Sequence, residues 1–304
     1  MLMESNFMRL MMFFGALFLG VFVGLVLMAL LGMALHVPVT ELQSLVNQTG
    51  TAAERTTTKI FLLINHLSFF ILPSVFFAWF AQRWDYQDYF SLRRWPKRKS
   101  IGLGVLFVLV AYPFVQKSYD INNMLPIPQW MLEMEKAATE TIRQLLIMEH
   151  AGEFLLNILV IGILPGIGEE LLFRGVIQKE FERWFRNPHV GVWLAAILFS
   201  AMHFQFVGFL PRMFLGALLG YLYVFTRNLF VPMLVHFINN VLPVISLYLA
   251  GKDLTELGTD PSASSPWWLA ILSFVLTLAL GYYIYSLHKS PADESVPHVE
   301  DPQP

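Results

Sequence analysis

The 304-residue chain contains no cysteine and few charged side chains for its length. The absence of cysteine excludes disulfides, thiolate zinc sites and cysteine nucleophiles, so any chemistry must come from Glu, His, Asn, Arg or hydroxyl groups. Only 14% of the residues are charged, whereas 56% are hydrophobic and the mean hydropathy is +0.57. This composition predicts a polytopic helical membrane protein. The formal net charge of −2 argues against nucleic acid as a partner.

Several motifs of known hydrolases are also missing from the sequence. No histidine is followed by glutamate, which excludes the zinc motif His-Glu-x-x-His. No aspartate lies in the apolar stretches that we expect to cross the membrane, which argues against a paired-aspartate mechanism. No serine stands in a rhomboid-type motif or in a Gly-x-Ser-x-Gly elbow. A site that activates water with glutamate and histidine is what remains.

Apolar stretches of about 20 residues, the length that crosses a bilayer, dominate the sequence. They predict an all-α, polytopic transmembrane helical bundle of about eight spans, with six to eight as the range. The stretches that begin at 101 and 211 are the weakest of these. The candidate spans are 8–35, 60–81, 101–117, 153–177, 190–207, 211–225, 229–250 and 266–287.

Lysine and arginine gather in two loop segments, 83–99 and 179–186. Such a bias is typical of cytoplasmic loops. With eight spans, it predicts that both termini are cytoplasmic. We therefore expect a multi-pass protein of the cell membrane, with membrane lipid as one partner.

The chain divides into four predicted parts. Residues 1–150 would hold N-terminal transmembrane helices and, at 127–149, an amphipathic helix on the outer surface, for which a lid is the alternative role. Residues 151–250 would form the catalytic core, and 251–289 a loop with the last transmembrane helix. The tail 290–304, rich in Pro, Asp and Glu, is expected to be disordered.

Two adjacent carboxylates, Glu169 and Glu170, interrupt an otherwise apolar run. Ionisable groups in hydrocarbon are costly and mark a functional site. Arg174 follows Glu170 by one helical turn and lies on the same face, whereas Glu169 points about 100° away. We therefore expect a structural ion pair between Glu170 and Arg174, with Glu169 facing a polar cavity as the active carboxylate.

Two further apolar segments carry histidines, namely Phe199-Ser-Ala-Met-His203 and His236-Phe-Ile-Asn-Asn240. His236 and Asn240 are one helical turn apart and project together. Loosely drawn span boundaries place these groups and Glu169 at overlapping depths, where a carboxylate and an imidazole can share a water. His236 and Asn240 could then donate hydrogen bonds to the developing oxyanion.

Other polar residues of the spans have simpler interpretations. His66, with Asn65 beside it, is expected to be a satisfied packing residue. Gly162, Gly166 and Gly168 are expected to allow close helix approach rather than to bind a ligand. Packing contacts between helices are also the alternative explanation for the glutamate and histidine cluster itself.

In these motifs the chain resembles the CPBP family of intramembrane proteases, which includes the type II CAAX prenyl endopeptidases and bacterial bacteriocin-processing or abortive-infection proteins. The family pattern is Glu-Glu-x-x-x-Arg, then Phe-x-x-x-His, then His-x-x-x-Asn or His-x-x-x-Asp, each in a separate membrane helix. The similarity covers about residues 150–245. The residues that carry it are Glu169, Glu170, Arg174, Phe199, His203, His236 and Asn240.

The resemblance implies an intramembrane endopeptidase that acts on a membrane-associated or lipid-modified peptide or protein. It implies that Glu169 activates water together with His203, while His236 and Asn240 support the oxyanion. We expect no cofactor, but zinc held by Glu169, His203 and His236 stays open, because His₂Glu is a known catalytic ligand set. The alternatives are a non-catalytic immunity or scaffold protein that uses the same cavity and a transporter with a glutamate proton relay.

Overall fold

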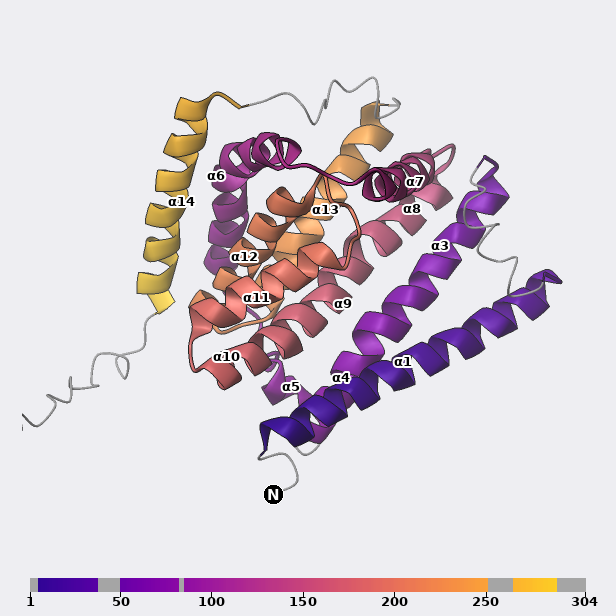
Figure 1. Cartoon of the computed structure of the whole chain (residues 1–304), viewed down its shortest axis with the longest axis horizontal. Coiled ribbons are helices and arrows are strands. Elements are labelled where there is room, and N and C mark those ends of the chain that lie inside the picture. The colour runs from indigo at the N-terminus through magenta and orange to yellow at the C-terminus, as the bar shows by residue number, and fades with distance from the viewer. Residues whose placement is uncertain (1–4, 38–49, 82–84, 251–264, 289–304) are drawn as a thin grey trace, which may run out of the picture.

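The computed structural model describes residues 5–37, 50–81, 85–250 and 265–288, and the regular structure of this part is entirely helical (Figure 1). The helices pack around a long, interrupted helix that runs from Ala151 to Phe185. The elements are α1 (Asn6–Leu35), α3 (Ala52–His66), η1 (Leu67–Ile71), α4 (Leu72–Ala81), α5 (Tyr86–Tyr89), α6 (Arg98–Asn123), α7 (Gln129–Leu145), α8 (Ala151–Asn157), η2 (Ile158–Ile163), α9 (Leu164–Leu172), η3 (Phe173–Gln178), α10 (Lys179–Phe185), α11 (Pro188–Ala201), α12 (Phe209–Thr226), α13 (Phe230–Ala250) and α14 (Trp267–His288).

The predicted all-α, polytopic bundle is confirmed. In the described part of the chain, seven helices are long and apolar enough to cross a membrane. The segment predicted as a span at 190–207 is shorter than expected, because α11 ends at Ala201 and a turn follows it. Seven long helices lie within the predicted range of six to eight. The cytoplasmic placement of both termini stays a prediction.

Three π-helical segments interrupt the two helices that meet at the middle of the bundle. η1 begins directly after His66, and η2 and η3 flank α9, which carries Glu169 and Glu170. A π-helical turn widens the helix and turns the residues that follow it, and such turns are frequent at functional sites. The direction of the side chains around α9 therefore depends on these interruptions.

Glycines let the neighbouring helices approach α9 closely, as the sequence predicted. A Cβ on Gly166 would lie 3.1 Å from both the carbonyl oxygen of Met233 and the amide nitrogen of Phe237 in α13. A Cβ on Gly168 would lie 3.1 Å from Phe70 in η1. Because these glycines lie directly before Glu169, the two carboxylates come close to both α13 and η1.

Helix α1 is held against this core by a charged contact and by a close approach at a glycine. Arg9 in α1 donates a hydrogen bond from Nε to Glu180 Oε2 over 2.8 Å, and its guanidinium lies 5.5 Å from the Phe77 ring centroid. A Cβ on Gly20 would collide with the backbone of Ser68 in η1. Thus α1 buttresses the π-helical turn that follows His66.

Two helices extend beyond the spans predicted from the sequence, and the added turns carry charged residues. The second long helix begins at Ala52 rather than at residue 60, so it includes Arg55 and Lys59. The third extends to Asn123 and therefore contains Asp120, which pairs with Lys117 at 2.8 Å. Hydropathy stops a span at its first charge, whereas a neutralised charge can be kept inside a helix.

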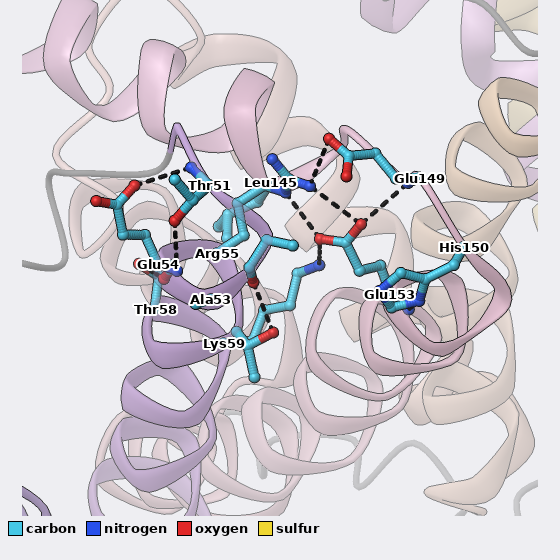
Figure 2. A network of polar contacts seen from close by, with 12 residues as sticks. Thr51, Ala53, Glu54, Arg55, Thr58, Lys59, Leu145, Glu149, His150 and Glu153 are labelled. Carbon is cyan, nitrogen blue, oxygen red and sulfur yellow. Dashed lines mark hydrogen bonds and ion pairs between the residues drawn. The ribbon is translucent and has the colours of Figure 1, made fainter. Parts of the chain in front are cut away.

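Figure 2 shows how the charges at the start of α3 are neutralised. Arg55 Nε donates to Glu153 Oε1 over 2.7 Å, and Lys59 Nζ lies 3.8 Å from the same oxygen. All three side chains are buried. Glu149, which is largely exposed, adds a second carboxylate 3.1 Å from Arg55. This cluster joins α3 to α8.

The amphipathic helix predicted at 127–149 is present as α7. It is attached to the bundle at two places, because Asn157 donates to the Leu145 carbonyl over 2.8 Å and Glu135 accepts a hydrogen bond from the Val207 amide over 2.7 Å. The division into four parts stays a prediction, and the tail 290–304 lies outside the described residues.

The contact between α9 and α13 predicts a steric cost for a methyl group at Gly166. Gly166→Ala should lower the free energy of unfolding in detergent micelles by about 1 to 3 kcal/mol, because the added carbon presses on backbone atoms that cannot turn away. Gly102→Ala in α6 is the matched control, since nothing lies within 4 Å of its Cβ position. That variant should be neutral or more stable, because alanine favours helix. Equal stability of the two variants would contradict the close approach.

Candidate functional site

The buried carboxylate of Glu170 joins three elements of the bundle. Its Oε1 accepts a hydrogen bond from Arg174 Nη1 over 2.7 Å and lies 2.8 Å from His236 Nδ1. Arg174 Nη2 donates to the Gly216 carbonyl in α12 over 2.7 Å. The ion pair expected from the one-turn spacing is therefore present, and it also connects α9 with α12 and α13.

Glu169 points to other partners than Glu170, as the helical geometry predicted. Its Oε1 lies 3.6 Å from His66 Nε2, and its Oε2 lies 3.9 Å from His236 Nε2. The Glu169 side chain is only 9% exposed. Both separations are too long for a direct hydrogen bond, so the carboxylate faces the two imidazoles without being bonded to them.

Three histidines around Glu169 share one arrangement of their ring nitrogens. The Nδ1 atoms of His66 and His203 lie 3.0 and 2.7 Å from the carbonyl oxygens of Leu62 and Phe199. A carbonyl oxygen only accepts, so Nδ1 must carry the proton in both rings. His236 Nδ1 likewise faces a carboxylate. In each neutral ring, Nε2 then carries the lone pair and can accept a proton.

Phe199 packs between the ion pair and two of these histidines. The Arg174 guanidinium lies 4.8 Å from the centroid of its ring. The ring centroids of His203 and His236 lie 4.9 and 6.0 Å from the same ring, both with steep interplanar angles. Phe199 is buried and contacts all of these groups, while its supporting role in a catalytic site stays a prediction.

The sequence suggested that His203 lies within the span 190–207. In the structure it lies in the turn that follows α11. Its ring is partly buried and within electrostatic range of Glu169. Arg212 holds the next part of this turn through hydrogen bonds to Gln205, one of them 2.6 Å long to its side chain. In this turn the His203 ring stays against Phe199, one helical turn earlier, which itself lies near His236.

Asn240 lies one turn after His236 on α13, as predicted, but its hydrogen bonds are made to residues other than the candidate catalytic ones. Its Nδ2 donates to the Ile161 carbonyl in η2 over 3.2 Å, and its Oδ1 accepts from Asn239 over 3.2 Å. An amide nitrogen has two N–H groups, and one of them is directed at Ile161. The oxyanion role of Asn240 stays a prediction.

His66 is the residue whose position the sequence reasoning missed. Its ring stacks on Phe70 with centroids 5.2 Å apart, which agrees with the packing role that we expected. The same ring, however, directs Nε2 at Glu169. The only signal in the sequence was the presence of a histidine inside an apolar span.

Metal binding was left open by the sequence and stays so. Glu169 and the Nε2 lone pairs are chemically suited to zinc. Among the described residues, however, no three His, Asp or Glu side chains gather closely enough to hold an ion together. The predicted set of Glu169, His203 and His236 is therefore tested by chelation rather than by this geometry.

Comparison with known proteins agrees with the resemblance found in the sequence. Residues 151–242 match the family described as type II CAAX prenyl endopeptidase Rce1-like. The Bacillus subtilis (strain 168) protein described as uncharacterized protein YpbD is 38% identical over 86 residues, which are 27% of this chain and 41% of that protein. The match thus spans about two fifths of the curated relative. No solved structure matches the chain.

The buried ion pair predicts a large loss of stability in Arg174→Ala. Removing the guanidinium leaves Glu170 charged, buried and without its cation, which should lower the free energy of unfolding by about 3 to 5 kcal/mol. Arg183→Ala, at an exposed position of α10, is the control and should unfold like the wild type. Thermal unfolding in detergent measures both. A stable but inactive Arg174→Ala protein would instead mean that the arginine acts on substrate.

Proposed function

We propose that this chain, which carries an Rce1-like domain over residues 151–242, is an intramembrane endopeptidase that cleaves a membrane-associated or lipid-modified substrate. The observation that carries the proposal is that two adjacent carboxylates have different partners. Glu170 is neutralised by Arg174, whereas Glu169 faces the Nε2 atoms of His66 and His236 with no cation bonded to it in the described structure. A buried carboxylate among proton acceptors is suited to polarise a water molecule.

In the proposed first step, a water molecule binds between Glu169 and one or more of the imidazoles. The water donates hydrogen bonds to the carboxylate and to an Nε2 lone pair, which turns an oxygen lone pair toward the substrate carbonyl. The new C–O bond forms as one proton passes from the water to Glu169 or to a histidine. His203 is the partner that the family resemblance assigns to this role.

The second step breaks the C–N bond. The proton taken from water is delivered to the departing amine, so that water and peptide become a carboxylic acid and an amine. An imidazolium Nε2–H, or the second N–H of Asn240, would donate to the oxyanion in between. Glu170 is a positioning residue in this scheme, because it holds the His236 ring through Nδ1.

Two other functions use the same polar cluster. A non-catalytic immunity or scaffold protein would need the cavity for binding but not Glu169 as a base. A transporter would use the glutamate as a proton relay, although no internal repeat supports that function. Neither alternative requires the Nε2 lone pairs to face one carboxylate.

Glu169→Gln is expected to abolish peptide cleavage while the protein stays folded. The amide keeps the size of the side chain but cannot accept the proton, so the rate should fall at least about 10²-fold. Purified wild type and variant would be incubated with a library of membrane-protein substrates, and products identified by mass spectrometry. Glu182→Gln on α10 is the matched control and should cleave like the wild type.

The cleavage assay is repeated for wild type and for Glu169→Gln in the presence of a strong zinc chelator. Products that persist with chelator and disappear in Glu169→Gln would support water activation without metal. Products lost with chelator would make Glu169, His203 and His236 metal ligands. Equal behaviour of wild type and Glu169→Gln would favour the immunity or scaffold protein.

His66→Phe separates the packing role of His66 from a role in proton transfer. Phenylalanine retains an aromatic ring to stack on Phe70 but removes Nε2, so thermal stability should change little. Cleavage should slow by about 10² or more if the nitrogen takes part in water activation. Wild-type cleavage rates in this variant would leave His66 as a packing residue only. His189→Phe, a histidine on α11 bonded to Tyr221, is the control.

A further inference from the structure

A cavity lies at the end of the bundle where the basic segment 83–99 joins α6. Its volume is about 300 Å³, and it is bounded by the start of α6, the end of α12, the start of α13 and the end of α14. None of the candidate catalytic residues lines it. A ligand bound here would therefore touch none of the candidate catalytic residues.

The mouth of this cavity is basic. Lys97 and Lys99 line it, and no Asp or Glu does so among the described residues. The nearby Arg93 differs, because it pairs with Asp85 and Asp88. Lys99 Nζ lies 5.7 Å from the ring centroid of Tyr283, a contact that orients the side chain without neutralising it. Two cations at one opening favour an anionic ligand.

Neutral hydrogen-bonding groups form the floor beneath the lysines. Ser100 Oγ lies 3.0 Å from His288 Nε2, and His288 Nδ1 lies 2.9 Å from the Ile284 carbonyl. The carbonyl requires the proton on Nδ1, so the Ser100 hydroxyl donates to Nε2. The start of α6 adds to this floor, because its N-cap Lys97 offers no side-chain acceptor to the first amides. Such amides also favour an anion.

The inner wall of the cavity is apolar. Leu103, Val231 and Leu287 form it, each from a helix long and apolar enough to span the membrane. Trp95 directly precedes the lining residue Pro96, has 65% of its surface exposed, and packs its ring 4.9 Å from that of Phe230, the neighbour of the lining residue Val231. Exposed tryptophans of membrane proteins concentrate at the bilayer surface. In a bilayer, a cavity with these neighbours would open at the level of the lipid headgroups and continue along the acyl chains.

We propose that this cavity binds the phosphate headgroup of an anionic phospholipid. Lys97 and Lys99 would contact the phosphate, and the wall of Leu103, Val231 and Leu287 would contact the first part of an acyl chain. A free phosphate ion would share the basic mouth but would gain nothing from the apolar wall. Basic pockets between transmembrane helices are the typical sites of such headgroups.

The test compares two double variants that each remove two positive charges from the same basic segment, residues 94–99. The double variant Lys97→Gln, Lys99→Gln removes both positive charges that line the cavity. The double variant Arg94→Gln, Arg98→Gln removes two neighbouring charges that do not line it. The full chain would be placed in phosphatidylcholine nanodiscs and titrated with phosphatidylglycerol, and retained lipid would be counted by native mass spectrometry. Thermal unfolding in phosphatidylcholine alone checks that both variants are folded.

The lysine variant should bind phosphatidylglycerol about tenfold more weakly than wild type, and the arginine variant should differ by less than about twofold. An equal loss in both variants would mean attraction by the loop charge in general and would overturn the proposed site, as would unchanged binding by the lysine variant. Excess inorganic phosphate should leave the lipid bound. Displacement by phosphate would assign the cavity to the free ion instead.

Discussion

The Glu170 carboxylate, shared between Arg174 and His236, is the interaction on which the rest of the site depends. One oxygen accepts from a guanidinium on its own helix and from an imidazole on α13. A buried charge of this kind is tolerated only when it is paired, and removing one partner is far costlier than replacing the pair. The pairing therefore fixes where α13 stands relative to α9. It also turns the His236 ring so that Nε2, rather than Nδ1, is directed at Glu169.

π-Helical turns and glycines bring the helices around the Glu170 ion pair close together. The π-helical turns η2 and η3 flank α9, and η1 follows His66, so each wall of the site adjoins a widened turn. Gly166 and Gly168 allow backbone contact on both sides of the glutamates. In a membrane, helices associate through such close packing rather than through a hydrophobic driving force. A larger side chain at either glycine would separate the carboxylates from the imidazoles that they face.

The sequence predicted what depends on a single helix and failed where two helices meet. The fold class follows from hydropathy, and the Glu170–Arg174 pair follows from a spacing of one turn. The position of His66 beside Glu169 could not be predicted from the sequence, because it depends on how α3 crosses α9. The early start of α3 was missed for the same reason, since Arg55 is neutralised by Glu153, 98 residues further along the chain. The short α11 turned His203 from a span residue into a turn residue, which periodicity does not reveal.

The two charged clusters on the long interrupted helix show why one is structural and the other is suited to chemistry. Both oxygens of Glu153 are held by protein donors, because Arg55 donates to each of them and the Glu149 amide donates to one. This carboxylate is therefore committed to joining α3 and α8. Glu169 is buried to a similar degree, yet its nearest ring nitrogens stand 3.6 and 3.9 Å away. A buried carboxylate with no direct donor in the described structure has oxygens open to a water molecule, which is why the proposed function assigns the role of base to Glu169 and not to Glu153.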